Sequence, residues 1–202
     1  MCKIEAPGKV DSELREFWVE DPWQIMAMGH NLSAYERKRA FLNARGKALL
    51  EISHLTGADN DGDGRSVVAA DFFNTGRIDL IVRQVGGGSL MLYENRFPQK
   101  HFLKVSLRGH TSNPQGVGAR IEAVTRGLRQ TREMYPYNTY RSQAPNIVHL
   151  GLGESDTVER LTIRWPSGKV QEFSDVKADR HIVVDEEKEV SAAAIETVMP
   201  RN

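Results

Sequence analysis

This sequence has little of what anchors a protein in a membrane or braces it with covalent bridges. Its 202 residues include a single cysteine, Cys2, so no disulfide can form within the chain, and we expect a free thiol near the N-terminus. No run approaches the ~18 apolar residues that a membrane-spanning helix needs. The first residues lack the apolar stretch of a secretory signal peptide, which weakly favours a cytoplasmic location.

Familiar catalytic and zinc-binding motifs are also missing. The six histidines show neither the HxH nor the HExxH spacing, which argues against a zinc site. There is no Gly-x-Ser-x-Gly nucleophile motif. The glycine triplet at residues 86–88 has the wrong spacing for a phosphate-binding loop and predicts a hairpin turn. These absences predict a protein that is not an enzyme, although shifted pKa values in a cleft would not be visible in a sequence.

Neither sign of charge is in excess. Lys+Arg and Asp+Glu each number 27, so the formal net charge is zero. The balance hides an asymmetry, because residues 96–149 contain nine basic and two acidic residues, whereas the segments on either side are acidic. A basic middle segment favours an anionic partner, but the segments can also neutralise one another across the folded surface. No RNP-like or helix-turn-helix pattern accompanies the basic segment, which argues against nucleic acid as the partner.

What the chain does contain is a series of short apolar runs with a two-residue period. Leu103, Val105 and Leu107, for example, alternate with polar residues. About eleven such runs, separated by glycine- and proline-bearing turns and almost without helical periodicity, predict an all-β protein.

The runs divide the chain into four regions. Residues 1–38 are predicted to form an N-terminal arm, with a short helix that is capped at Asp11-Ser12 and ended by Asp21-Pro22, and with a helical turn beginning at Ser33. Residues 39–95 form a small antiparallel sheet, and residues 96–186 form a β-sandwich of seven or eight strands. Residues 187–202 form a mobile acidic tail.

Two acidic, glycine-punctuated loops follow one another in the small sheet. In the first, Asp59, Asp61 and Asp63 recur at every second residue before a glycine, which is how a calcium-binding loop begins, and Asp71 is a candidate fourth ligand. An EF-hand loop has glutamate at its twelfth position, where this chain has Ala70. Asp, Asn and Gly are also ordinary turn residues. Weak binding of Ca²⁺ and a purely structural turn are therefore both open.

The second loop has lost part of this pattern. Asp71, Gly76 and Asp79 recur at comparable offsets, but Phe73 and Thr75 stand where further carboxylates are expected. The second loop is therefore predicted not to form a complete calcium cage.

A tyrosine- and arginine-rich segment is the candidate site for a partner or ligand. Its residues are Arg120, Arg129, Arg132, Tyr135, Tyr137, Tyr140 and Arg141. Tyrosine rings and guanidinium groups stack on sugars and anchor protein partners. In the alternative interpretation, the tyrosines cover the edge of the sandwich and the arginines extend into solvent.

Four motifs in the C-terminal half resemble those of one family. They are Ser112–Arg120, Tyr140–Pro145, His149–Gly153 and Trp165–Lys169. In their order along the chain these segments resemble the ASPIC/UnbV domain. The resemblance implies no established reaction; members of this family look like binding, adhesion or biosynthetic accessory proteins.

The preceding segment, from Phe41 to Asn95, resembles one FG-GAP/VCBS repeat, the propeller blade that precedes this domain in cartilage-acidic-protein-like sequences. The two resemblances together cover roughly residues 30–185. Such proteins usually carry several blades and are commonly exported, whereas this chain has about one blade. A single blade cannot close a propeller, so we expect it to pack on the sandwich or on another protein.

We therefore predict a non-catalytic binding or scaffold protein that serves as an accessory subunit of a larger protein assembly. One alternative is a calcium-dependent carbohydrate- or matrix-binding module. A third is an accessory enzyme of secondary metabolism, which rests only on the resemblance to UnbV.

Overall fold

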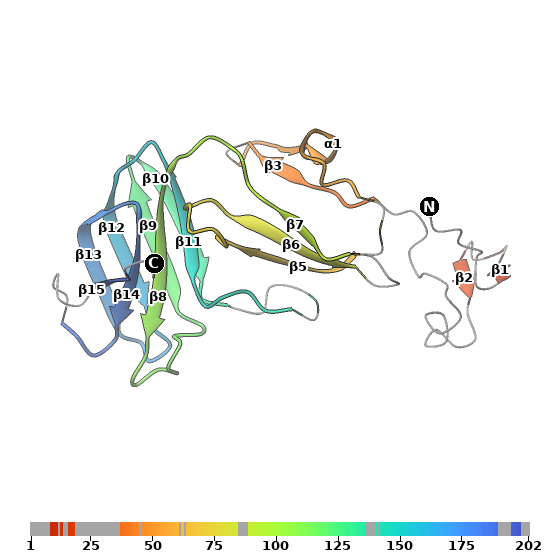
Figure 1. Cartoon of the computed structure of the whole chain (residues 1–202). Helices are drawn as coiled ribbons and strands as arrows, with labels where there is room; N and C mark the ends of the chain where they lie inside the picture. Colours follow the sequence, from red (N-terminus) through yellow and green to blue (C-terminus); the bar gives the residue numbers. More distant parts are fainter. Residues whose placement is uncertain are drawn as a thin grey trace. The chain divides into compact units, whose positions relative to one another are not determined.

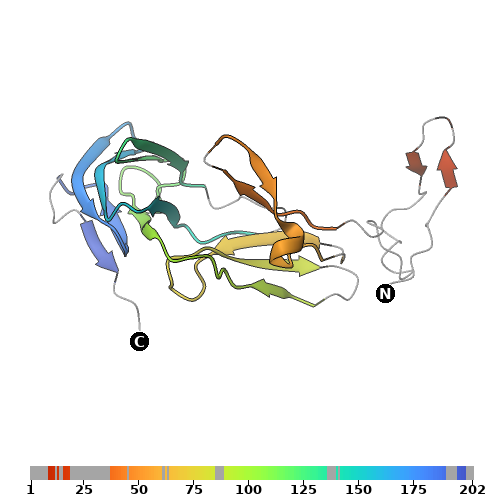
Figure 2. The same ribbon diagram turned by 90° about the horizontal axis from the view of Figure 1, so that it is seen from above.

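A computed structural model of the chain describes residues 9–11, 13, 16–18, 37–44, 46–60, 62, 64–84, 89–135, 140, 142–189 and 195–198. These residues are almost all in strands, turns and loops, which confirms the predicted all-β class (Figures 1 and 2). The chain divides into two compact units. The N-terminal unit comprises Met1–Val67 and Ile81–Tyr93, and the sandwich unit comprises Val68–Leu80 and Glu94–Asn202.

Two four-stranded sheets make up most of the sandwich unit. The first has the order β10-β9-β12-β13, and all its neighbours are antiparallel. The second has the order β11-β8-β14-β15, in which β8 and β14 run parallel. The strands are β8 (His101–Arg108), β9 (Arg120–Thr125), β10 (Leu128–Glu133), β11 (Val148–Gly153), β12 (Thr157–Arg164), β13 (Val170–Lys177), β14 (Arg180–Asp185) and β15 (Ile195–Val198).

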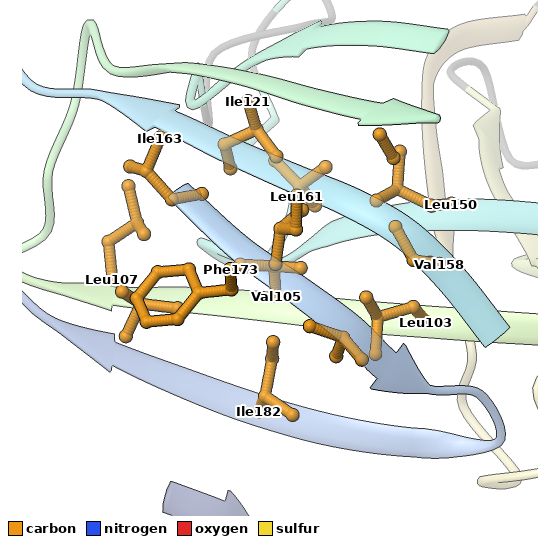
Figure 3. Close-up of a cluster of buried hydrophobic side chains, with 14 of the residues drawn as sticks. Leu103, Val105, Leu107, Ile121, Leu150, Val158, Leu161, Ile163, Phe173 and Ile182 are labelled. Atoms are coloured by element: carbon orange, nitrogen blue, oxygen red, sulfur yellow. The ribbon is translucent and has the colours of Figure 1, made fainter. Parts of the chain in front are cut away.

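The hydrophobic core lies between these two sheets. Alternate residues of most strands, such as β8 and β9, point inward, as the two-residue period of the sequence predicts. Leu103 and Val105 of β8 meet Ile121 of β9, Leu161 of β12 and Ile182 of β14 in one buried layer (Figure 3). Burying one such side chain stabilises the fold by about 1.5–3 kcal/mol relative to leaving it in water. The sandwich therefore provides the rigid support for any site on its outer faces.

Further short elements precede the sandwich strands in the chain. They are β3 (Phe41–Asn43), β4 (Leu49–Glu51), α1 (Ser53–Thr56), β5 (Gly64–Ala70), β6 (Asp79–Gln84) and β7 (Met91–Tyr93). The strands β3 and β4 form a hairpin, and β5-β6-β7 form a separate three-stranded sheet. Residues 39–95, expected to form one sheet, thus form two, because the helical turn α1 and the left-handed Gly57 interrupt the chain between β4 and β5.

The N-terminal arm differs from its prediction. Strands β1 (Lys9–Asp11) and β2 (Glu16–Trp18) pair with each other in antiparallel register where a helix was expected. A helix of two turns is marginal by itself because its first turn is costly to form, and strand pairing takes its place here. The helical turn predicted at Ser33 lies outside the described residues.

The C-terminal segment also differs from its prediction as a mobile tail. Ile195–Val198 within it forms β15, which pairs antiparallel with β14. Arg108 and Lys188 form ion pairs with Glu196 of β15, and these pairs neutralise part of the negative charge of the segment. In the part of the chain that the structure describes, no helix has the length and hydropathy needed to cross a membrane.

Candidate functional site

Three ionisable side chains form a row across the outer face of the second sheet. Lys104 of β8 lies between His149 of β11 and His181 of β14, because the strand register pairs Lys104 with both histidines. Leu103 and Val105, the chain neighbours of Lys104, point into the core. Alternation along the strand therefore places the row on the face away from the core. Sequence reasoning missed this row, because it joins three strands that are far apart in the chain.

The loop between β5 and β6 contacts this row through Asp71. Nζ of Lys104 lies 2.9 Å from Oδ2 of Asp71 and 3.4 Å from Oδ1 of Asn74. The two charged side chains are only 12% and 3% exposed. Burial would raise the pKa of Asp71, but hydrogen bonds from Lys104 and from two backbone amides outweigh this effect and hold the pKa below its ordinary value. Asp71 is therefore ionised at neutral pH.

His149 is fixed by the same loop. Its Nε2 atom lies 2.8 Å from the carbonyl oxygen of Gly76, and because a carbonyl only accepts, Nε2 carries the proton. The ring stacks on Phe102 with centroids 5.7 Å apart. Burial, aided by the positive charges of Lys104 and Arg132, lowers the pKa of His149 below 6.5, although the bond to Gly76 acts in the opposite direction. His149 is therefore neutral at pH 7.

His181 is held by a serine on the neighbouring strand. Its Nε2 atom lies 2.8 Å from Oγ of Ser106, and this hydroxyl donates to the carbonyl of Asn146 at 3.4 Å. The imidazole N–H therefore donates to the hydroxyl, which leaves Nδ1 as an acceptor. Burial and the charge of Lys104 lower the pKa of His181, so it is also neutral at pH 7.

A pocket of about 140 Å³ lies in the sandwich unit between the loop and this row of side chains. Its polar lining consists of Asp71, Asn74, Lys104, His149 and His181. Its apolar lining consists of Ala69, Ala70, Ile78, Pro145 and Ile147. Two of the family-like motifs contribute here, since Pro145 and His149 belong to them.

The carboxylates of the second acidic loop are already occupied by protein donors. Asp71 accepts the backbone N–H groups of Thr75 and Gly76 as well as the ammonium of Lys104. Asp79, which is buried, accepts the N–H groups of Phe72 and Asn95. These bonds close the loop without a metal, and the lysine supplies the positive charge that a cation supplies in a calcium loop.

The first acidic loop is described only in part. Asp59 forms an ion pair with Arg37, with 2.6 Å between Nη1 and Oδ2, and Nδ1 of His54 lies 3.5 Å from the same oxygen. Asp61 and Asp63 lie outside the described residues. Within the described residues, no group of three or more Asp, Glu, His or Cys side chains is arranged to hold a metal ion.

The structure separates the members of the tyrosine- and arginine-rich segment. Arg120 and Arg129 lie on the outer face of the first sheet, since their register partners Glu133 and Val124 lie there. Arg132 pairs with the inward-pointing Ile121 and therefore lies on the opposite face of this edge strand. On this face Arg129 forms an ion pair with Glu122 at 3.6 Å, whereas Arg120 lies opposite Arg164 in the register of β9 and β12. Tyr135 and Tyr140 are exposed, and Tyr137 and Arg141 lie outside the described residues.

A buried carboxylate connects two of the family-like motifs. Glu186 is 2% exposed and accepts hydrogen bonds from the backbone N–H groups of His110 and Ser112 and from the hydroxyls of Ser112 and Ser167. Burial opposes its ionisation, yet these four donors lower the pKa of Glu186 to about 2. Ser112 and Ser167 thus have a structural role. Sequence reasoning missed Glu186, because its partners come from two distant loops.

A second buried polar group supports the same turn. The indole N–H of Trp165 donates to Oε1 of Gln171 at 2.7 Å, and Nε2 of Gln171 donates to the carbonyls of Asp185 and Lys188. Gly116 completes the arrangement at φ +63°, where an added Cβ would lie 2.7 Å from Cδ1 of Leu107. The Trp, Ser and Gly residues of these motifs therefore hold this end of the sandwich together.

The β3–β4 hairpin of the N-terminal unit presents an unusual apolar surface. Leu42 pairs with Leu50, and Leu49 pairs with Asn43 beside Phe41. These apolar side chains are 55% (Phe41), 44% (Leu42), 67% (Leu49) and 51% (Leu50) exposed. Because adjacent residues point to opposite faces, apolar side chains are exposed on both faces of the hairpin.

Comparison with known proteins identifies one domain in this chain. No curated protein sequence matches it. The family model described as "ASPIC and UnbV" matches residues 109–191, a range that begins directly after β8 and includes the strands from β9 to β14. The C-terminal part of the chain therefore contains an ASPIC/UnbV domain.

Proposed function

We propose that this protein is a non-catalytic binding protein, an accessory subunit that joins a larger protein assembly through its β3–β4 hairpin. The observation that carries the proposal is the exposure of Phe41, Leu42, Leu49 and Leu50 on a two-stranded sheet. An isolated two-stranded hairpin is at best marginally stable in water, and it gains stability when another surface covers it. Contiguous exposed apolar side chains on a soluble protein mark interaction sites.

The charges around the hairpin indicate what kind of partner it fits. Residues 37–51 contain five basic residues and a single acidic one, Glu51, and Glu51 is already paired with Arg39. A partner segment with apolar and acidic side chains would match both the exposed leucines and the surrounding positive charge. Within the described part of the chain, the outer edges of β3 and β4 pair with no further strand, so they offer backbone groups to which a partner strand can pair.

We further propose that residues 39–95 are one FG-GAP/VCBS-like repeat of the kind found in cartilage-acidic-protein-like sequences. Short antiparallel strands and glycine-punctuated acidic loops support this assignment. A repeat unit buries its apolar faces against its neighbours. A repeat with exposed leucines is therefore suited to pack against another protein surface.

The proposal is tested by comparing two double variants of the tagged chain in native purifications from its source. Leu42→Ser/Leu50→Ser removes the apolar pair from one face of the hairpin. Leu128→Ser/Val170→Ser changes two similarly exposed apolar side chains of the sandwich unit and serves as the matched control. Circular dichroism confirms that each variant is folded.

We expect a stoichiometric partner protein that the wild type and the control retain and that the hairpin variant loses. The proposal fails if light scattering shows a monomer for the wild type and all three chains recover the same proteins. It also fails if the control loses the partner and the hairpin variant keeps it.

A further inference from the structure

The pocket in the sandwich unit is large enough for a small organic molecule. Its volume of about 140 Å³ is close to the roughly 150 Å³ of an engineered cavity that accommodates benzene. Ala69, Asn74, Pro145 and Ile147 on its lining are exposed, so solvent reaches it. A ligand of about six heavy atoms, or one end of a longer molecule, can therefore enter.

The charges of the lining cancel. Lys104 is neutralised by Asp71 at 2.9 Å, and His149 and His181 are neutral because burial lowers the pKa of each. A charged ligand would need its own counter-charge in this partly buried site, or it would have to separate the Lys104–Asp71 pair. The pocket therefore favours a neutral ligand.

The hydrogen-bonding groups of the lining are mixed. Lys104 has three N–H donors, two of which are directed to Asp71 and Asn74. His149 and His181 use Nε2 for Gly76 and Ser106, and among the described residues neither Nδ1 atom has a hydrogen-bond partner. The lining therefore contains one N–H donor and two Nδ1 acceptors that form no hydrogen bond with the described residues. A hydroxyl group, which both donates and accepts, matches such a set.

We propose that this pocket binds the hydroxyl groups of a small neutral polyhydroxy compound, either a free polyol or the terminal sugar of a glycan. The apolar side chains of the lining, such as Ile78 and Ile147, contact its C–H groups. The Lys104 ammonium and the two imidazole Nδ1 atoms bind its hydroxyls. This site lies within the sandwich unit, involves no metal, and is independent of the hairpin surface.

Saturation-transfer NMR on the full chain tests the proposal. Erythritol and D-xylose represent free polyols and sugars, and a neutral oligosaccharide that ends in xylose represents a glycan end. D-glucuronate and D-glucosamine provide the charged comparison. Long-range ¹H–¹⁵N spectra of the histidine rings report directly on His149 and His181. Each measurement is made both with and without EDTA.

Two variants alter the pocket and a third is the matched control. Asn74→Gly removes the side-chain oxygen that orients the Lys104 ammonium in the lining, and glycine suits the positive φ of 54° at this position. Ala69→Leu narrows the pocket while its polar groups remain. Asp175→Gly makes the same kind of change at another exposed residue of positive φ, 55°, which does not line the pocket.

We expect at least one neutral probe to bind and to shift the Nδ1 resonances of His149 and His181. The Asn74→Gly and Ala69→Leu variants should each bind this probe about ten-fold more weakly. This is the loss expected for one good hydrogen bond or for a comparable loss of shape complementarity. The Asp175→Gly variant should bind the probe as the wild type does. Binding of the oligosaccharide alone identifies a glycan end, and binding of erythritol identifies a free polyol. The proposal is overturned if no neutral probe binds, if the charged sugars bind more tightly, if EDTA abolishes binding, or if both pocket variants bind as the wild type does.

Discussion

The Nζ atom of Lys104 lies 2.9 Å from the Oδ2 atom of Asp71, and together they link a β-strand of the sandwich to the loop that follows β5. Asp71 occupies the first position of an acidic loop whose later carboxylate positions are Phe73 and Thr75. An ammonium group from elsewhere in the chain therefore supplies the charge that this loop needs. The same contact positions Asn74 and His149 around the pocket.

Lys104→Met should destabilise the protein by about 3 kcal/mol, because it leaves the buried carboxylate of Asp71 without its counter-charge. Urea unfolding measures this loss. Lys100→Met is the control, since Lys100 pairs with Glu154 in an exposed ion pair, and exposed pairs contribute about 1 kcal/mol or less. Equal effects of the two substitutions would contradict the role assigned to Lys104.

The second acidic loop should bind no calcium, because protein donors already occupy Asp71 and Asp79. We expect Asp71→Asn to leave the response of the melting temperature to millimolar CaCl₂ unchanged. Asp61→Ala, in the first loop, is the comparison. A calcium response that disappears in Asp71→Asn and persists in Asp61→Ala would refute this prediction.

The stability of the sandwich should fall in acid because of Glu186. Its pKa is about 2 in the folded protein against an ordinary value of 4.5. A lowered pKa stabilises the folded state above the unfolded value, and this contribution is lost as the pH falls from about 4.5 towards 2. The loss amounts to about 3 kcal/mol, since each pKa unit corresponds to about 1.4 kcal/mol.

Urea unfolding between pH 6 and pH 2 measures this dependence. Glu186→Gln should be less stable than the wild type at pH 6 and should show a flatter pH profile. The exposed Glu133 offers a matched control, Glu133→Gln, whose profile should follow that of the wild type. Identical profiles for Glu186→Gln and the wild type would show that the four hydrogen bonds do not stabilise the ionised carboxylate.

Gly116→Ala should destabilise the sandwich by about 2–4 kcal/mol. The added methyl would meet Leu107 at 2.7 Å and the Trp165 ring at 3.2 Å, so overpacking adds to the strain of a left-handed alanine. Gly127→Ala isolates the strain, because φ is +83° there and nothing lies within 4 Å of the added carbon. Thermal melting of both variants should show a clearly larger loss for Gly116→Ala.

The local pattern of the sequence was sufficient to predict the strands of the sandwich. Inward residues such as Leu103 and Leu161 recur at every second position because a strand buries one face, and this period does not depend on which strand becomes the neighbour. The motifs from Ser112 to Lys169 were likewise sufficient to predict the ASPIC/UnbV domain. The helix predicted between Asp11-Ser12 and Asp21-Pro22 was wrong, because a local capping pattern does not reveal the competing pair formed by β1 and β2.

The candidate site was not predictable in this way. The row formed by His149, Lys104 and His181 depends on the register of three strands. The pairing of β15 depends on contacts of Glu196 with Arg108 and Lys188, which both lie outside β15. The acidic composition of residues 187–202 had instead indicated a solvated tail.

By itself, the sequence determined the all-β class, the strand positions of the sandwich and the family of its C-terminal domain. These features follow from the two-residue period of side chains and from short motifs, and both are local properties of the chain. Only the tertiary structure decided that Lys104 meets Asp71, that Glu186 is enclosed by four donors, and that a neutral pocket lies beside two histidines. The pKa values and the pocket arise when distant strands bring charges and hydrogen-bonding groups together and exclude water from them.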